Sequence, residues 1–124
     1  MSEIHFLNID LDIESKEDIS PIVEFWGDAV MVFRLEEAEG VWLGSFETSE
    51  DAQNDIVNKY HQLITSLPPN LRAIWDRCIK RIFDFGFEAG SSPRVFQSAL
   101  SQSSISKLAE IGGAITVTIY ASAD

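Results

Sequence analysis

The sequence is poor in the features that mark secreted and membrane-spanning proteins. It contains a single cysteine, Cys78, so no internal disulfide can form and nothing indicates an oxidising compartment. The longest apolar run, residues 29–33, is far shorter than the roughly 18 apolar residues of a membrane-spanning helix. The first ten residues lack the basic and apolar regions of a signal peptide. We therefore expect a cytoplasmic protein that does not enter a membrane.

Positive charge is also scarce, and the negative charge is unevenly distributed. Nine lysines and arginines stand against 20 aspartates and glutamates, which gives a net charge of −11. Residues 1–60 hold 15 of the acidic side chains and only 3 of the basic ones. Because this charge repels phosphate groups, we expect neither nucleic acid nor a membrane surface as a partner. A basic partner protein, a cation or the need for solubility would each account for the acidic residues.

Motifs for catalysis and metal binding are absent. Asp10, Asp12 and Glu14 begin like a calcium loop. The sixth and twelfth positions of that loop are Ser15 and Pro21, where glycine and glutamate are required. The two histidines lack a second ligand at zinc spacing, and no Gly-x-Ser-x-Gly elbow is present. The sequence therefore predicts no cofactor, no metal site and no catalytic residue, and an enzyme is the weakest functional hypothesis.

The periodicity of apolar residues predicts the fold class. Alternation over residues 5–13 is typical of a strand with one buried face, with Leu7 on the buried side and Phe6 on the polar side. Helices are predicted where apolar residues recur every three or four positions. Because no strand is continuously apolar, we predict an α+β fold: a mainly antiparallel sheet with helices on one face, in a single domain over residues 1–124. The predicted order is βαββααββαβ, with the last three strands at 81–88, 94–100 and 114–120.

An internal repeat is indicated by an offset of 86 residues. At this offset residues 15–33 align with 101–119. The alignment pairs Ser15 with Ser101 as helix caps, and it also matches a glutamate, an apolar stripe and the terminal glycine of each helix. True duplication and the general likeness of capped amphipathic β-α-β units both explain it. Either explanation predicts two similar units sharing one sheet, as in a pseudo-duplicated ferredoxin-like arrangement.

Several structural features occur together between Trp42 and Tyr120. They are a tryptophan within a strand, an acidic loop, a helix that ends at Leu67-Pro68, and a final helix, glycine turn and strand ending in Ile-Tyr. In this combination the chain resembles a family of small bacterial domains of unknown function. The resemblance implies a bacterial protein and supports the predicted fold. It implies no catalytic or binding residue, because each shared feature is structural.

One group of polar residues suggests a recognition surface. The polar faces of the first, fourth and last strands would combine into an acidic sheet face that no helix covers, with a tryptophan at its border. A merely hydrated face, or one that closes a homodimer, explains the same pattern equally well. The predicted partner-binding residues are Asp10, Asp12, Glu14, Trp42, Asp84, Thr116, Thr118 and Tyr120.

These observations favour a non-catalytic protein-interaction module. Its acidic surface would bind a basic protein, as immunity proteins bind basic effectors by electrostatic complementarity. The alternative is a regulatory domain that binds a small molecule in a pocket between the sheet and the helices. Salt distinguishes the two, because a complex held by charge weakens with ionic strength whereas binding in an apolar pocket does not.

Overall fold

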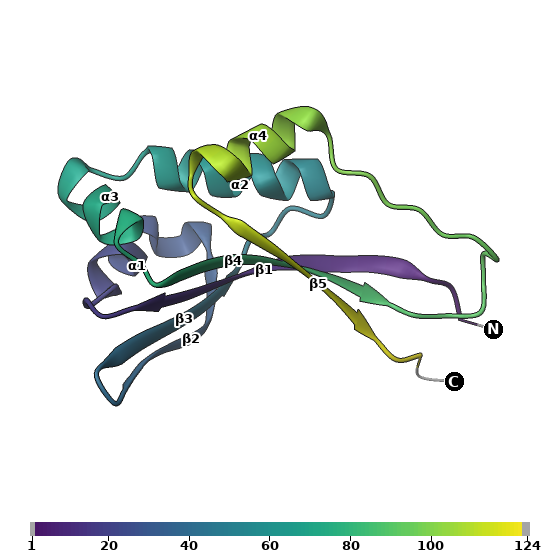
Figure 1. Cartoon of the computed structure of the whole chain (residues 1–124), viewed down its shortest axis with the longest axis horizontal. Helices are drawn as coiled ribbons and strands as arrows, with labels where there is room; N and C mark the ends of the chain where they lie inside the picture. The colour runs from purple at the N-terminus through teal and green to yellow at the C-terminus, as the bar shows by residue number, and fades with distance from the viewer. Residues whose placement is uncertain (1, 123–124) are drawn as a thin grey trace.

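The computed structural model describes residues 2–122, which form five strands and four α-helices (Figure 1). In chain order the elements are β1 (His5–Ser15), α1 (Ser20–Trp26), the 3₁₀ helix η1 (Gly27–Ala29), β2 (Met31–Ala38), β3 (Val41–Glu47), α2 (Gln53–Thr65), α3 (Pro69–Asp76), β4 (Lys80–Glu88), α4 (Gln102–Glu110) and β5 (Ala114–Tyr120). No helix among residues 2–122 is long and apolar enough to cross a membrane.

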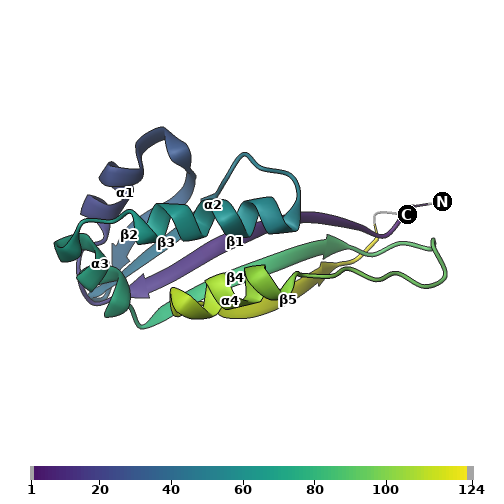
Figure 2. The same ribbon diagram turned by 90° about the horizontal axis from the view of Figure 1, so that it is seen from above.

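The strands form one sheet in the order β2-β3-β1-β4-β5. Neighbouring strands are antiparallel except β4 and β5, which run parallel. The helices lie together on one face of this sheet, as the two views show (Figures 1 and 2). We call this side the helix face and the opposite side the open face. The predicted α+β class, with a mainly antiparallel sheet and helices on one side, is confirmed.

Two β-α-β units lie at the two sides of the sheet. In the first, β1 and β2 run parallel because both are antiparallel to β3, which lies between them. In the second, β4 and β5 are direct parallel neighbours joined through α4. The two helices do not begin at equivalent positions, because α1 starts four residues later than α4 once the offset of 86 is applied. The internal duplication itself stays a prediction.

The predicted cap at Ser15 is wrong. Ser15 is the buried last residue of β1, and its Oγ accepts the backbone N–H of Glu17 at 3.0 Å. Helix α1 begins later, with Pro21 in its first turn and no side-chain cap at Ile19. Ser101 does cap α4, because its Oγ accepts the backbone N–H of Ser104 at 3.1 Å. The two serines therefore have different structural roles despite their alignment.

The strand predicted over residues 94–100 does not form. This stretch is an extended connection with no sheet pairing. It alternates as a strand would, because Leu100 and Phe96 turn toward apolar neighbours while Val95 is 72% exposed. The pairing partners are missing, since β1 and β5 already occupy both edges of β4. The sheet consequently has five strands instead of six.

The alternation predicted for the first strand breaks at a bulge. The register of β1 against β4 shifts between Phe6 and Asn8, which leaves Leu7 as the extra residue. Phe6 therefore packs against the core and contacts Phe87 with ring centroids 5.5 Å apart, contrary to the predicted orientation. Leu7, predicted to be buried, is 44% exposed and lies on the open face. Beyond the bulge, Ile9 and the alternate residues after it are buried as predicted.

The core lies between the sheet and the helices, and its two largest buried side chains are tied to the backbone. The Tyr60 hydroxyl of α2 donates to the carbonyl oxygens of Ile9 and Phe46, at 3.1 and 3.0 Å. The Trp75 indole of α3 donates to the carbonyl oxygen of Ile111 at 2.8 Å. Burial without these bonds would leave polar groups unsatisfied. The Tyr60 bonds attach α2 to β1 and β3, and the Trp75 bond attaches α3 to the end of α4.

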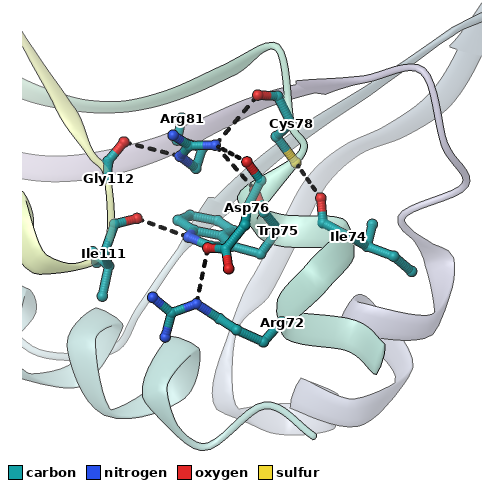
Figure 3. A network of polar contacts seen from close by, with 8 residues as sticks. All are labelled: Arg72, Ile74, Trp75, Asp76, Cys78, Arg81, Ile111 and Gly112. Carbon is teal, nitrogen blue, oxygen red and sulfur yellow. Dashed lines mark hydrogen bonds and ion pairs between the residues drawn. The ribbon is translucent and has the colours of Figure 1, made fainter. Parts of the chain in front are cut away.

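Arg81 connects the end of α3 to the turn that leads into β5 (Figure 3). Its Nη1 lies 3.1, 3.1 and 3.3 Å from the carbonyl oxygens of Trp75, Asp76 and Cys78. Its Nε donates to the carbonyl oxygen of Gly112 at 2.9 Å, where the backbone has a positive φ of 72°. Because a guanidinium carries donors in a fixed planar fork, it satisfies both sets of carbonyls at once.

We predict that Arg81→Lys lowers the free energy of unfolding by about 1–2 kcal/mol, since an ammonium cannot reproduce the forked contacts. The measurement is urea unfolding followed by circular dichroism. Arg94→Lys is the matched control, because Arg94 is exposed and forms no ion pair within residues 2–122. Equal stability of the two variants would show that Arg81 does not hold this junction.

Candidate functional site

The open face gathers acidic side chains from three adjacent strands. Asp10 of β1 is directly opposite Asp84 of β4, and Asp84 is in turn opposite Thr116 of β5. On the other side of β1, Asp12 is opposite Ser45 of β3. Because residues paired across a sheet project to the same side, these side chains share one surface. We call the carboxylates of Asp10, Asp12, Glu47 and Asp84 the acidic cluster.

A hollow of about 380 Å³ lies within this surface. Gly86 contributes no side chain there, and a Cβ at that position would lie 3.6 Å from the Tyr120 ring. The walls combine apolar and acidic groups. The apolar side chains of Leu7 and Tyr120 are accessible there, since they are 44% and 51% exposed. The lining residues are Leu7, Asn8, Asp10, Glu47, Asp84, Gly86 and Tyr120.

Neutral donors hold three of the four carboxylates in place. Ser45 Oγ donates to Asp12 and Thr118 Oγ1 donates to Asp84, each at 2.7 Å. The Asn8 amide donates to Glu47. Among residues 2–122, no lysine, arginine or histidine forms an ion pair with any member of the acidic cluster. The negative charge of the cluster is therefore not neutralised by the described part of the chain.

Asp10 bears the electrostatic cost of this arrangement. Partial burial, followed by the charges of Glu47, Asp12 and Asp84, raises the pKa of Asp10 from 3.8 to about 6. The buried Tyr60 hydroxyl lies below the same group, and its pKa is raised first by burial and then by the charges of Asp10 and Glu47. A cationic group placed in the hollow would lower the pKa of Asp10 by favouring its ionised form.

The chemistry open to this site is recognition of positive charge. No group of three histidine, cysteine, aspartate or glutamate side chains within residues 2–122 is arranged to hold a metal ion. Carboxylates accept hydrogen bonds from ammonium and guanidinium groups, and these charge-assisted bonds are stronger than neutral ones. The exposed Tyr120 ring and the Leu7 side chain offer apolar contact for the stem of a long basic side chain.

Most of the predicted site residues lie on the open face. Asp10, Asp84 and Tyr120 meet at the hollow, and Thr118 and Thr116 flank Asp84. Asp12 and Glu14 continue along β1 away from the hollow. Glu14 is partly neutralised, because its carboxylate lies 3.5 Å from Lys80 Nζ.

The predicted place of Trp42 is wrong. Trp42 is opposite Ser15 and shares its face with Gly44 and Phe46, so it packs against the core on the helix face. Both faces of this strand carry apolar residues, since Val41 and Leu43 alternate with Trp42 and Phe46. Exposure of the tryptophan could therefore not be read from its pattern. Trp42 does not belong to the acidic surface.

Sequence reasoning missed Glu47, Ser45, Gly86 and Leu7. Glu47 and Ser45 alternate with the buried Phe46, so the period of two was a usable signal for their common face. Their closeness to Asp10 and Asp12 depends on the pairing of β1 with β3, which is a long-range contact. Leu7 was missed because a bulge, which has no local marker here, turns it outward.

Comparison with known proteins finds no matching family model, no matching curated protein and no matching solved structure. The resemblance to small bacterial domains of unknown function therefore stays a prediction, and the site must be interpreted from its own geometry.

We predict that Asp10→Asn stabilises the protein at neutral pH. The folded state holds the Asp10 proton more tightly than the unfolded chain does, so this group makes stability fall as pH rises from about 4 through about 6. Each pKa unit corresponds to ~1.4 kcal/mol, and solvent screening reduces the effect to about 1–2 kcal/mol above pH 7.

Chemical unfolding at pH 4.5 and pH 7.5 measures this effect. Glu24→Gln is the matched control, because Glu24 is an exposed residue of α1 and loses the same unit of charge. The stabilising effect of Asp10→Asn should exceed that of the control at pH 7.5 and shrink to about a third of its size at pH 4.5, which is still above the ordinary pKa of 3.8. An equal effect of both variants at both pH values would contradict the crowding of Asp10.

Proposed function

We propose that this chain is a non-catalytic interaction module that binds a cationic segment of a partner protein on its open sheet face. The observation that carries the proposal is the acidic cluster, which holds four carboxylates without a basic counter-charge from residues 2–122. Keeping these groups ionised together is costly, because partial burial first and the neighbouring carboxylates second raise the pKa of Asp10. A positively charged partner would offset the repulsion between these carboxylates, and this gain in free energy would favour binding.

The hollow fits the end of a lysine or arginine side chain. A cation bound between Asp10 and Asp84 would not compete with a lysine, arginine or histidine of the chain itself, since none forms an ion pair with these two residues within residues 2–122. The aliphatic stem would lie against Leu7, and the charged group would face the ring of Tyr120. Asp12 extends the negative surface along β1 for a neighbouring basic residue, whereas Glu14 already pairs with Lys80.

Immunity proteins use acidic surfaces to bind basic effectors, and this chain shares that charge character. The comparison is an analogy of surface chemistry. The second candidate, a regulatory domain for a small molecule, would use the same hollow if the ligand were a small amine, because about 380 Å³ is within the size of small-ligand sites.

The test uses an oligoarginine peptide and arginine amide as probes, with binding followed by NMR chemical-shift changes. We expect the peptide to shift the signals of Leu7, Asp10, Asp84 and Tyr120, and to bind more weakly as salt increases. Asp10→Asn combined with Asp84→Asn should weaken binding about tenfold, which corresponds to ~1.4 kcal/mol. If arginine amide binds as tightly as the peptide, the small-molecule function is favoured instead.

The control variant combines Glu24→Gln with Asp28→Asn, which removes two charges from exposed positions in α1 and η1. It has the same net charge as the double variant of the cluster. If both variants weaken peptide binding equally, the attraction comes from overall charge and the proposed site is wrong. Shifts spread over all acidic surfaces would lead to the same conclusion.

A further inference from the structure

The two outer edges of the sheet differ in their side chains. The edge strand β2 carries Arg34, Glu36 and Glu37, and a register shift interrupts it between Val32 and Arg34. Charges and bulges on an edge strand discourage pairing with another strand. The opposite edge, β5, has no charged residue, no proline and a continuous register with β4. Residues 111–122 carry no charge at all in a chain of net charge −11.

The outer backbone groups of β5 belong to its apolar residues. The Tyr120 carbonyl oxygen accepts the N–H of Ala89 at 2.8 Å, so Tyr120 directs its backbone toward β4. Alternate residues do the same, whereas Ile115, Val117 and Ile119 direct their N–H and C=O groups to the free edge. These are unpaired donors and acceptors of the kind that edge strands offer to another strand. No described strand lies beyond β5.

The central five residues of β5 are palindromic about Val117. Residues 115–119 read Ile-Thr-Val-Thr-Ile. In an antiparallel pair of two such strands related by a twofold axis at Val117, Val117 meets its own copy and Ile115 meets Ile119 of the second copy. Residues that meet as hydrogen-bonded pairs exchange two N–H···O=C bonds each. The residues with outward backbone groups are the same ones that this register pairs.

The side chains next to this edge leave apolar surface uncovered. Ile115, Val117 and Ile119 are 49%, 58% and 68% exposed on the helix face. Two adjoining hollows of about 230 and 290 Å³ extend this surface toward α4 and the connection before it. A patch of this kind is typical of a protein interface. The other residues that line it include Phe85, Phe87, Phe96, Leu100 and Ile105.

We propose that two copies of this chain associate through their β5 strands, antiparallel and in the register centred on Val117, to form one continuous sheet. The second copy supplies what the edge lacks, which is partners for the outward backbone groups and apolar cross-strand neighbours for Ile115 and Ile119. The pairing is self-complementary, as a twofold interface requires.

The net charge of the protein does not prevent this pairing. The nearest members of the acidic clusters are the two Asp84 carboxylates, and each lies one strand inside its β5. Three strand spacings of about 4.8 Å separate them by about 14 Å, which exceeds the Debye length of about 8 Å at physiological ionic strength. A twofold axis between antiparallel strands is perpendicular to the sheet, so both open faces lie on the same side of the dimer.

The oligomeric state, measured by light scattering coupled to size-exclusion chromatography, tests the proposal. We expect a dimer of the full chain and a monomer for Val117→Lys, which places two like charges on the twofold axis. Val95→Lys adds the same charge at an apolar residue that is 72% exposed and outside β5, and it should remain a dimer. A monomeric wild type at sub-millimolar concentration, or a Val117→Lys variant that is still dimeric, would overturn the proposal.

Two substitutions of opposite charge test the register separately. Because the second substitution should restore the dimer, misfolding of a single variant cannot produce the expected result. Ile115→Lys alone should weaken the dimer at least tenfold. Adding Ile119→Glu should restore it, because the register places residue 115 of one copy opposite residue 119 of the other. The restored dimer should dissociate as salt increases. If the second substitution weakens association further, residues 115 and 119 do not meet and the proposed register is wrong.

Discussion

The structure depends on the burial of one face of its central strand, β1, while the other face stays open. Ile9, Leu11 and Ile13 of β1 are at most 2% exposed beneath the helices, so Asp10 and Asp12 must point to the opposite face. A slip of one residue would bury the carboxylates and expose the isoleucines, which fixes the register of β1 against both neighbours. The acidic cluster is therefore a consequence of forming the core. Packing of the helix face determines which acids meet on the open face.

The rest of the site follows from how β5 is attached. A parallel strand needs a crossover connection, and here α4 and the glycine turn after it provide one. Arg81 fixes that turn to the end of α3 through carbonyl contacts on both sides. This attachment brings Thr118 to Asp84 and places Tyr120 at the rim of the hollow. The same strand leaves an uncharged edge outside the sheet, so one element serves both the acidic site and the proposed contact between copies.

The acidic cluster lies on the open face and the proposed contact between copies lies at the β5 edge, so neither blocks the other. Because the twofold pairing keeps both open faces on one side, a dimer would present two acidic surfaces in the same direction. A partner with two basic segments could then bind both, and its apparent affinity would exceed that of a single contact. Each surface uses its own chemistry: exposed carboxylates in one case, and uncharged backbone with branched apolar side chains in the other.

Local patterns in the sequence predicted most of the elements and the common face of Asp10, Asp84, Thr118 and Tyr120. They failed where long-range pairing decides the outcome. Residues 94–100 alternate like a strand, but both edges of β4 are occupied. Trp42 lies on a strand that is apolar on both faces, so only the register with β1 assigns its side.

The other errors in the predictions also depend on packing and pairing around β1. Ser15 could cap a helix or end a strand, and the burial of β1 selects the second role. The bulge at Leu7 reverses the faces of Leu7 and Phe6. Both residues are apolar, so their side-chain type does not indicate which of them faces the core. Composition and periodicity therefore predict which residues form an element, whereas pairing across the sheet decides which residues share a site.

The most direct test of the acidic site is the pKa of the Asp10 carboxyl group, measured by NMR titration with and without an oligoarginine peptide. A value near 6 in the free protein, falling by about a unit or more with saturating peptide, is what a crowded cluster that binds cations requires. A value near 4 in the free protein, or one that the bound peptide leaves unchanged, would contradict the account.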